Sequence, residues 1–164
     1  MNLSPSAGRT LVLILSLCGC MACTGARDPK TPASEPRTAL EMLRDRASGV
    51  QWDAASQRKA DFDQDGQQDA AFLGFRKDKA VVGIVQGPMT SRRRISLLEF
   101  DRGGGGQDDL CSEKVGIDLE RLEELESPEE VPVKGIGVNL HDDRCDAFHI
   151  YWDPVNRRFD WWRL

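Results

Sequence analysis

The chain has 164 residues, a length that suits one domain. Its formal net charge is −5, from 22 Lys and Arg against 27 Asp and Glu, and acids and bases are mixed along the sequence. This acidic balance argues against nucleic acid as a main partner.

Residues 1–19 have the composition of a signal peptide. Arg9 and the amino terminus supply positive charge before a short apolar core at residues 11–17. That core is too short for a membrane span, which needs about 20 apolar residues. We therefore expect a targeting segment that is removed.

The signal ends in Leu-Cys-Gly-Cys at residues 17–20, which resembles a bacterial lipobox. In that family a small residue precedes the cysteine that is lipidated. The resemblance implies a cell-envelope protein lipidated at Cys20, with Cys23 or ordinary secretory cleavage as alternatives. Because Met21 rather than Asp follows Cys20, resemblance to enterobacterial sorting favours the periplasmic side of the outer membrane over the inner membrane.

Residues 20–37 are predicted to be the lipidated cysteine and a flexible tether. Pro29, Pro32 and Pro36 stand there among Thr, Ser, Ala and mixed charges, without apolar periodicity. The folded domain then spans residues 38–164.

A short helix is predicted at the start of this domain. Thr38 and Glu41 have the spacing of a capping box. Leu40, Leu43 and Ala47 follow at helical spacing, and Gly49 offers a stop. We expect the apolar stripe of this helix to pack on a sheet.

Residues 61–69, Asp-Phe-Asp-Gln-Asp-Gly-Gln-Gln-Asp, have the spacing of a calcium loop. Calcium takes about six to eight oxygen ligands, and carboxylates at alternate positions of a tight loop can converge on one ion. Glycine suits the position where the loop turns sharply. The predicted ligands are the side chains of Asp61, Asp63, Asp65 and Asp69 and the backbone carbonyl of Gln67. The alternative is a solvated acidic turn without an ion.

This loop differs from an EF-hand, which carries a Glu at its twelfth position, where this chain has Phe72. The pattern D-x-D-x-D-G-x-x-D before a strand resembles the calcium loop of FG-GAP and VCBS repeats. The resemblance covers the loop alone and implies a structural calcium ion.

The domain is predicted to be mainly β (α+β), as an antiparallel sheet or a small sandwich or meander. Nearly continuous apolar runs at residues 70–75 and 80–85 flank a hairpin turn and indicate strands buried on both faces. A third strand is expected at residues 95–100. Residues 118–130 fit either a short helix or an irregular excursion.

Alternating residues near the carboxyl terminus predict a meander of three strands, at residues 136–140, 147–152 and 158–162. A turn is expected at residues 153–156. The end of the chain, from Cys145 onwards, resembles small proteobacterial lipoproteins of unknown function. That resemblance implies no activity.

Cys111 and Cys145 are the only cysteines of the domain, and in an exported protein they predict a disulfide. The alternative is a thiol catalyst with His141 or His149 as its base. Two histidines without fixed spacing to acids do not define a zinc site.

These features favour a monomeric, lipid-anchored module of the cell envelope with a binding or structural role, not an enzyme. An envelope protein or a glycan is the candidate ligand. One alternative is a small envelope inhibitor, similar in architecture to lipoproteins that block lysozyme. Another is a hydrolase that uses the loop carboxylates and their ion as a Lewis acid. Joint exposure of Tyr151, Trp152, Trp161 and Trp162 would favour recognition, whereas burial would make them core.

Overall fold

The structure is a computed structural model that describes residues 37–88, 94–103, 106, 109–126, 128 and 134–163. These residues form one α-helix, nine strands and short 3-10 helices. The elements are α1 (Ala39–Arg46), β1 (Gln51–Trp52), η1 (Ala54–Ser56), β2 (Arg58–Ala60), β3 (Asp69–Arg76), β4 (Lys79–Val85), β5 (Ile95–Asp101), β6 (Val115–Arg121), η3 (Leu122–Glu124), β7 (Ile136–Asp142), β8 (Phe148–Asp153) and β9 (Arg158–Trp162).

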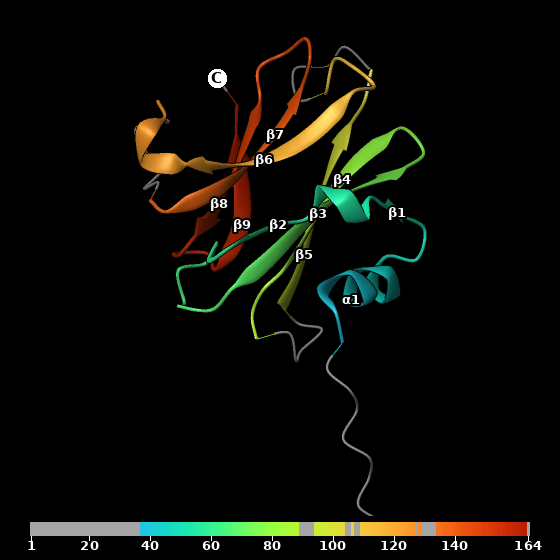
Figure 1. The fold of residues 1–164 in the computed structure, drawn as a ribbon. Coiled ribbons are helices and arrows are strands. Elements are labelled where there is room, and N and C mark those ends of the chain that lie inside the picture. Colours follow the sequence, from blue (N-terminus) through green and yellow to red (C-terminus); the bar gives the residue numbers. More distant parts are fainter. Residues whose placement is uncertain are drawn as a thin grey trace, which may run out of the picture. The chain divides into compact units, whose positions relative to one another are not determined.

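The strands form two antiparallel sheets (Figure 1). The first has the order β1-β3-β4-β5, with β2 also paired to β3, and the second has the order β6-β7-β8-β9. The prediction of a mainly β fold with one short N-terminal helix is confirmed.

One apolar core is shared by the two sheets. In the first sheet, Leu73 of β3 lies opposite Val82 of β4, and in the second, Val138 of β7 lies opposite Ile150 of β8. The buried members of this core are Phe62, Ala71, Leu73, Ala80, Val82, Ile84, Phe100, Leu110, Ile117, Val138, Leu140, Phe148, Ile150 and Phe159. Of the predicted arrangements, the structure is therefore the small sandwich.

Helix α1 covers the other face of the first sheet (Figure 1). Successive residues of a strand point to opposite faces, so Phe72 packs with Met42 and Leu43 of the helix while Leu73 enters the shared core. Strands β3 and β4 are thus buried on both faces, as their continuous apolar runs predicted.

The predicted capping box is present at the start of α1. Thr38 Oγ1 accepts a hydrogen bond from the Glu41 backbone N–H over 3.3 Å, and Glu41 Oε2 accepts one from the Thr38 N–H over 2.8 Å. The helix ends earlier than the predicted stop at Gly49: Arg46 is its last residue, and the N–H of Ala47 donates to the Leu43 carbonyl. Ala47 is buried just beyond the helix.

Residues 118–130 were expected to form either a short helix or an irregular excursion. Residues 118–121 instead belong to strand β6, and η3 follows at Leu122–Glu124. Residues 127, 129 and 130 lie outside the described residues. Leu119 and Leu122 have helical spacing, but Ile117 and Leu119 lie opposite Leu140 and Val138 of β7. Pairing with β7 decides the conformation, because it satisfies the backbone hydrogen-bonding groups that a short isolated helix would leave open.

The predicted meander at the carboxyl terminus is confirmed as β7, β8 and β9. His141 lies near the end of β7, opposite Gly116 of β6.

Candidate metal centre

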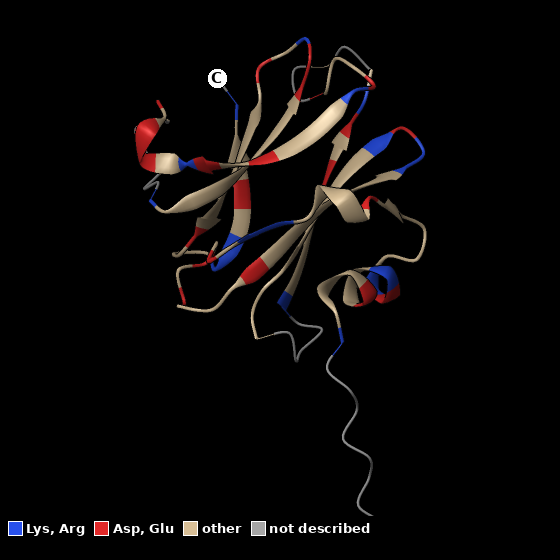
Figure 2. Cartoon of the chain, viewed as in Figure 1, with Lys and Arg blue, Asp and Glu red and all other residues tan. Residues whose placement is uncertain are grey.

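The aspartate loop, residues 61–68, connects β2 to β3 (Figures 1 and 2). Its two ends are fixed because Ala60 and Asp69 lie opposite each other in the antiparallel ladder. The backbone φ of Gly66 is 84°, a left-handed conformation that glycine adopts without a Cβ clash. The sharp turn predicted at Gly66 is therefore present.

Three of the predicted ligands converge. Asp61, Asp63 and Asp65 each offer a carboxylate oxygen, and these oxygens lie within 4.8 Å of one another. Backbone N–H groups orient them: Asp61 accepts from Asp65 over 3.1 Å and from Gly66 over 3.0 Å, and Asp65 accepts from Gln67 over 2.8 Å. We call these three residues the aspartate cluster.

Asp69 is not part of this cluster, although its spacing predicts a ligand. Its side chain is fully buried. One oxygen accepts from the N–H groups of Phe62 (2.8 Å) and Asp63 (3.3 Å), and the other accepts from Gly87 (2.7 Å). Burial raises the pKa of Asp69, and these backbone hydrogen bonds oppose that rise. The structure thus gives Asp69 a different role: its hydrogen bonds connect the loop to Gly87, just after the end of β4.

The backbone carbonyl of Gln67 is the fifth predicted ligand. The backbone N–H of Gln67 donates to Asp65, and the residue is exposed beside the turn. A role for the Gln67 carbonyl as a ligand stays a prediction.

Arg94 and Gln86 reach the aspartate cluster from the β4–β5 connection. The Arg94 Nη2 atom lies 2.6 Å from Asp65 Oδ2 and 3.4 Å from Asp63 Oδ2. Gln86 Nε2 donates to the same oxygen of Asp63. The hydrogen bond from Arg94 is the main cause that lowers the pKa of Asp65. The sequence analysis missed this contact, because Arg94 lies 29 positions from Asp65 and no local spacing connects them.

The donor set fits a hard divalent cation. Carboxylate oxygens are the ligands that calcium and magnesium prefer. The three aspartates carry a formal charge of −3 when they are ionised, and a divalent ion would offset most of it. Each carboxylate group, counted over its two oxygens, also keeps a lone pair beyond those that accept the hydrogen bonds described above. Among the described residues, the aspartate cluster can therefore hold a metal ion.

Cys111 and Cys145 lie in disulfide geometry, with their Cα atoms 5.8 Å apart. Asp142 joins the two segments, because it accepts from the N–H of Cys111 over 2.6 Å and from the N–H of Cys145 over 2.9 Å. The pairing predicted from the sequence is the one the structure contains, and it leaves neither sulfur as a free thiol.

The two histidines lie in separate hydrogen-bonded pairs. His149 Nδ1 lies 3.0 Å from a Glu120 oxygen, and both side chains are 9% exposed. His141 Nε2 lies 3.1 Å from Asp118, which also pairs with Arg58. Each histidine thus has a carboxylate partner from β6, which local sequence spacing could not indicate.

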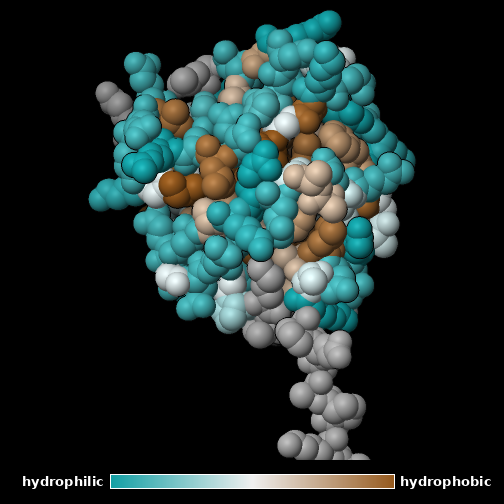
Figure 3. All heavy atoms as spheres, viewed as in Figure 1, coloured by the Kyte–Doolittle hydropathy of each residue, from teal (hydrophilic) through white to brown (hydrophobic). Residues whose placement is uncertain are grey.

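The aromatic residues near the carboxyl terminus are mostly core. Tyr151 and Trp162 are buried, and Trp152 and Trp161 pack against the shared core. On the face shown in Figure 3, hydrophobic residues form small areas separated by hydrophilic ones. The joint exposure that would favour recognition through these four side chains is therefore not observed.

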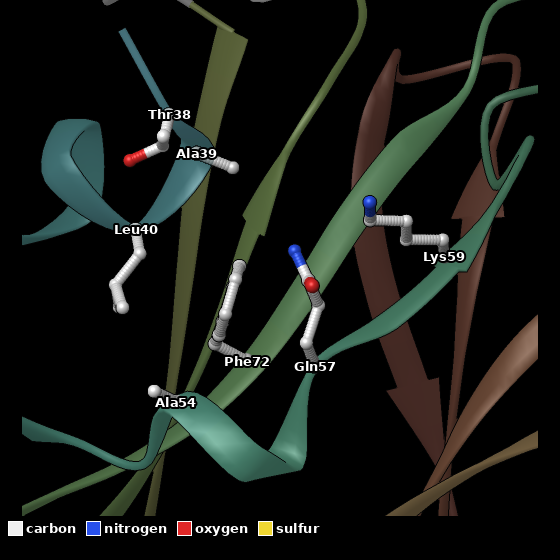
Figure 4. A pocket seen from close by; sticks show the side chains of 7 residues that line it. All are labelled: Thr38, Ala39, Leu40, Ala54, Gln57, Lys59 and Phe72. Atoms are coloured by element: carbon white, nitrogen blue, oxygen red, sulfur yellow. The ribbon is translucent and has the colours of Figure 1, made fainter.

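A pocket of about 460 Å³ lies between the start of α1, η1, β2 and β3 (Figure 4). It is lined by Thr38, Ala39, Leu40, Ala54, Gln57, Lys59 and Phe72. Its lining includes none of the site residues that the sequence predicts.

None of the protein-family models, curated proteins or solved structures compared with the chain matches it. In the part of the chain that the structure describes, no helix is long and apolar enough to cross a membrane. The predicted signal peptide, Cys20, Cys23 and the tether up to residue 36 lie outside the described residues.

Proposed function

We propose that this protein is a non-catalytic module of the bacterial cell envelope, anchored by a lipid at Cys20, whose β-sandwich is stabilised by one calcium ion. The observation that carries the proposal is the convergence of Asp61, Asp63 and Asp65 beside the start of a central strand. A divalent ion there would offset the repulsion among three carboxylates.

The position of the loop supports a structural rather than a catalytic ion. Phe62 lies inside the aspartate loop, yet its side chain is 2% exposed and belongs to the shared core. Asp69 follows the loop as the first residue of β3 and is fully buried. An ion that orders residues 61–65 would therefore also order the placement of Phe62 and the start of β3.

The proposed location in the cell envelope favours calcium as the bound ion. Loops that bind calcium outside the cytoplasm have dissociation constants of about 10⁻⁴–10⁻³ M. At ten times its dissociation constant, one bound ion adds about 1.4 kcal/mol to the free energy of unfolding. A change of this size is measurable as a rise in melting temperature.

The test is thermal unfolding of the purified protein in EDTA and in increasing calcium or magnesium. We expect a rise in melting temperature with calcium at millimolar concentration and a smaller rise with magnesium. A variant with Asp61→Asn and Asp63→Asn should lose the response. A wild-type protein that shows no calcium-dependent shift would leave the acidic loop as a solvated turn.

The anchoring and the ligand need separate measurements. Mass spectrometry of the mature amino terminus should find acyl groups on Cys20, whereas acylation of Cys23 or a soluble form would contradict the assignment. Capture of envelope proteins and glycans with and without calcium would identify the binding partner of the module.

A further inference from the structure

Arg94 places a positive charge against the aspartate cluster. It lies immediately before β5, and the antiparallel register pairs Val85 with Ile95. The backbone N–H of Gln86 donates to the Arg94 carbonyl over 2.8 Å, which continues this ladder by one hydrogen bond. The backbone of Arg94 is therefore fixed by the sheet, and its side chain reaches back to the loop.

The guanidinium makes three contacts in this position. Its Nη2 atom lies 2.6 Å from Asp65 and 3.4 Å from Asp63, and its Nη1 atom donates to the carbonyl of Gly87. The Asp63 side chain is only 4% exposed. A buried carboxylate without a positive partner is strongly unfavourable, so Arg94 supplies charge that Asp63 requires when no metal is bound.

A divalent ion bound to Asp63 and Asp65 would repel this guanidinium. Both cations would share the same two carboxylates, at separations of a few ångströms. Gln86 also holds Asp63, but its amide is neutral and does not repel a metal. Among the described residues of the β4–β5 connection, Arg94 is therefore the group whose contact with the cluster conflicts with metal binding.

We propose that Arg94 and a divalent cation are alternative partners of Asp63 and Asp65. This inference rests on the proposed metal site. Arg94 offsets part of the negative charge of the cluster in the metal-free protein, and metal binding displaces its guanidinium from these carboxylates. The competition weakens metal binding, so Arg94 sets the concentration at which the site fills. Because such coupling is reciprocal, metal binding weakens the contact of Arg94 with Asp63 and Asp65 by the same factor by which that contact weakens metal binding.

The experiment compares wild type with Arg94→Gln, Arg94→Lys and Arg158→Gln, by calorimetric titration with calcium and by thermal unfolding in EDTA. Arg158→Gln is the matched control, because it removes the same charge from an exposed pair with Asp160. Arg94→Lys keeps the charge but lacks the second nitrogen, which donates to the Gly87 carbonyl while Nη2 contacts the two carboxylates.

We expect Arg94→Gln to lower the melting temperature in EDTA and to decrease the calcium dissociation constant about two- to tenfold, as expected for the loss of one or two partly exposed ion pairs. Arg94→Lys should lie between wild type and Arg94→Gln. Arg158→Gln should leave the dissociation constant unchanged. Circular dichroism establishes that each variant is folded.

The outcomes separate this inference from the proposed function. If wild type binds calcium and Arg94→Gln binds it equally or more weakly, the metal site stands and the competition is wrong. If Arg94→Gln binds calcium and wild type does not, the competition is supported. Arg94 then prevents calcium binding in the wild-type protein. If no variant binds calcium, both proposals are overturned.

Discussion

Asp69 accepts a hydrogen bond from the backbone N–H of Gly87 over 2.7 Å, which joins the first residue of β3 to the segment after β4. Its other oxygen accepts from Phe62 within the loop. The acidic residues between positions 61 and 69 therefore have two different roles. The first three carboxylates face a candidate metal position, and the last one satisfies buried backbone donors.

The first prediction concerns Asp69. We expect Asp69→Ala to lower the free energy of unfolding by about 3 kcal/mol, because it leaves buried N–H groups without an acceptor. The loss should be the same in EDTA and in calcium, as measured by urea denaturation. Asp61→Ala is the comparison, since it should mainly remove the calcium response. If Asp69→Ala instead removed only the calcium-dependent stability, Asp69 would be a ligand.

The second prediction concerns the contact between Trp52 and Gly83. A Cβ atom on Gly83 would lie 2.6 Å from Trp52 Cη2 and 2.7 Å from Leu43 Cδ2. We expect Gly83→Ala to lower the free energy of unfolding by about 1–3 kcal/mol through overpacking. The control is Gly49→Ala, whose Cβ would meet only Arg76 Cδ at 3.6 Å. Equal melting temperatures for the two variants would contradict the packing of Trp52 on the sheet.

The third prediction concerns pH and Asp142. Burial alone would raise the pKa of Asp142, but hydrogen bonds from the N–H groups of Cys145, Arg144 and Cys111 outweigh it, so the pKa lies below its ordinary value. The ionised form is therefore stabilised by folding. Its contribution is complete above about pH 4 and is lost as the pH falls through the lowered pKa.

Asp142→Asn should accordingly be less stable than wild type at neutral pH, and the difference should shrink as the solution becomes acidic. The measurement is the free energy of unfolding from urea denaturation at several pH values. A difference that stays constant down to pH 2, about two units below the ordinary pKa, would show that ionisation of Asp142 has no part in it.

The fourth prediction concerns Cys111 and Cys145, which are 34 positions apart. Replacing both with Ala should lower the free energy of unfolding by about 3–4 kcal/mol, because the unfolded chain gains conformational freedom. Non-reducing peptide mapping should find the two peptides linked in wild type. Two free thiols in the exported protein would rule out this disulfide.

The sequence by itself determined the features that depend on near neighbours. The Thr38–Glu41 capping box, the turn at Gly66 and the alternation of the C-terminal strands all follow from spacings of a few residues, and all are present in the structure. Local steric and hydrogen-bonding preferences decide such features before any distant contact forms. The grouping of Asp61, Asp63 and Asp65 belongs to the same class.

Only the tertiary structure decided which distant groups meet these local features. Arg94 lies 29 positions from Asp65 and reaches it because Val85 pairs with Ile95. Asp69 accepts a hydrogen bond from Gly87 instead of joining the cluster, because β3 and β4 are neighbouring strands. Residues 115–121 form strand β6 despite the helical spacing of Leu119 and Leu122, because they pair with β7. The physical reason is common to all three. Strand register is set by packing of the whole core, and one register among many brings together groups that no local spacing connects.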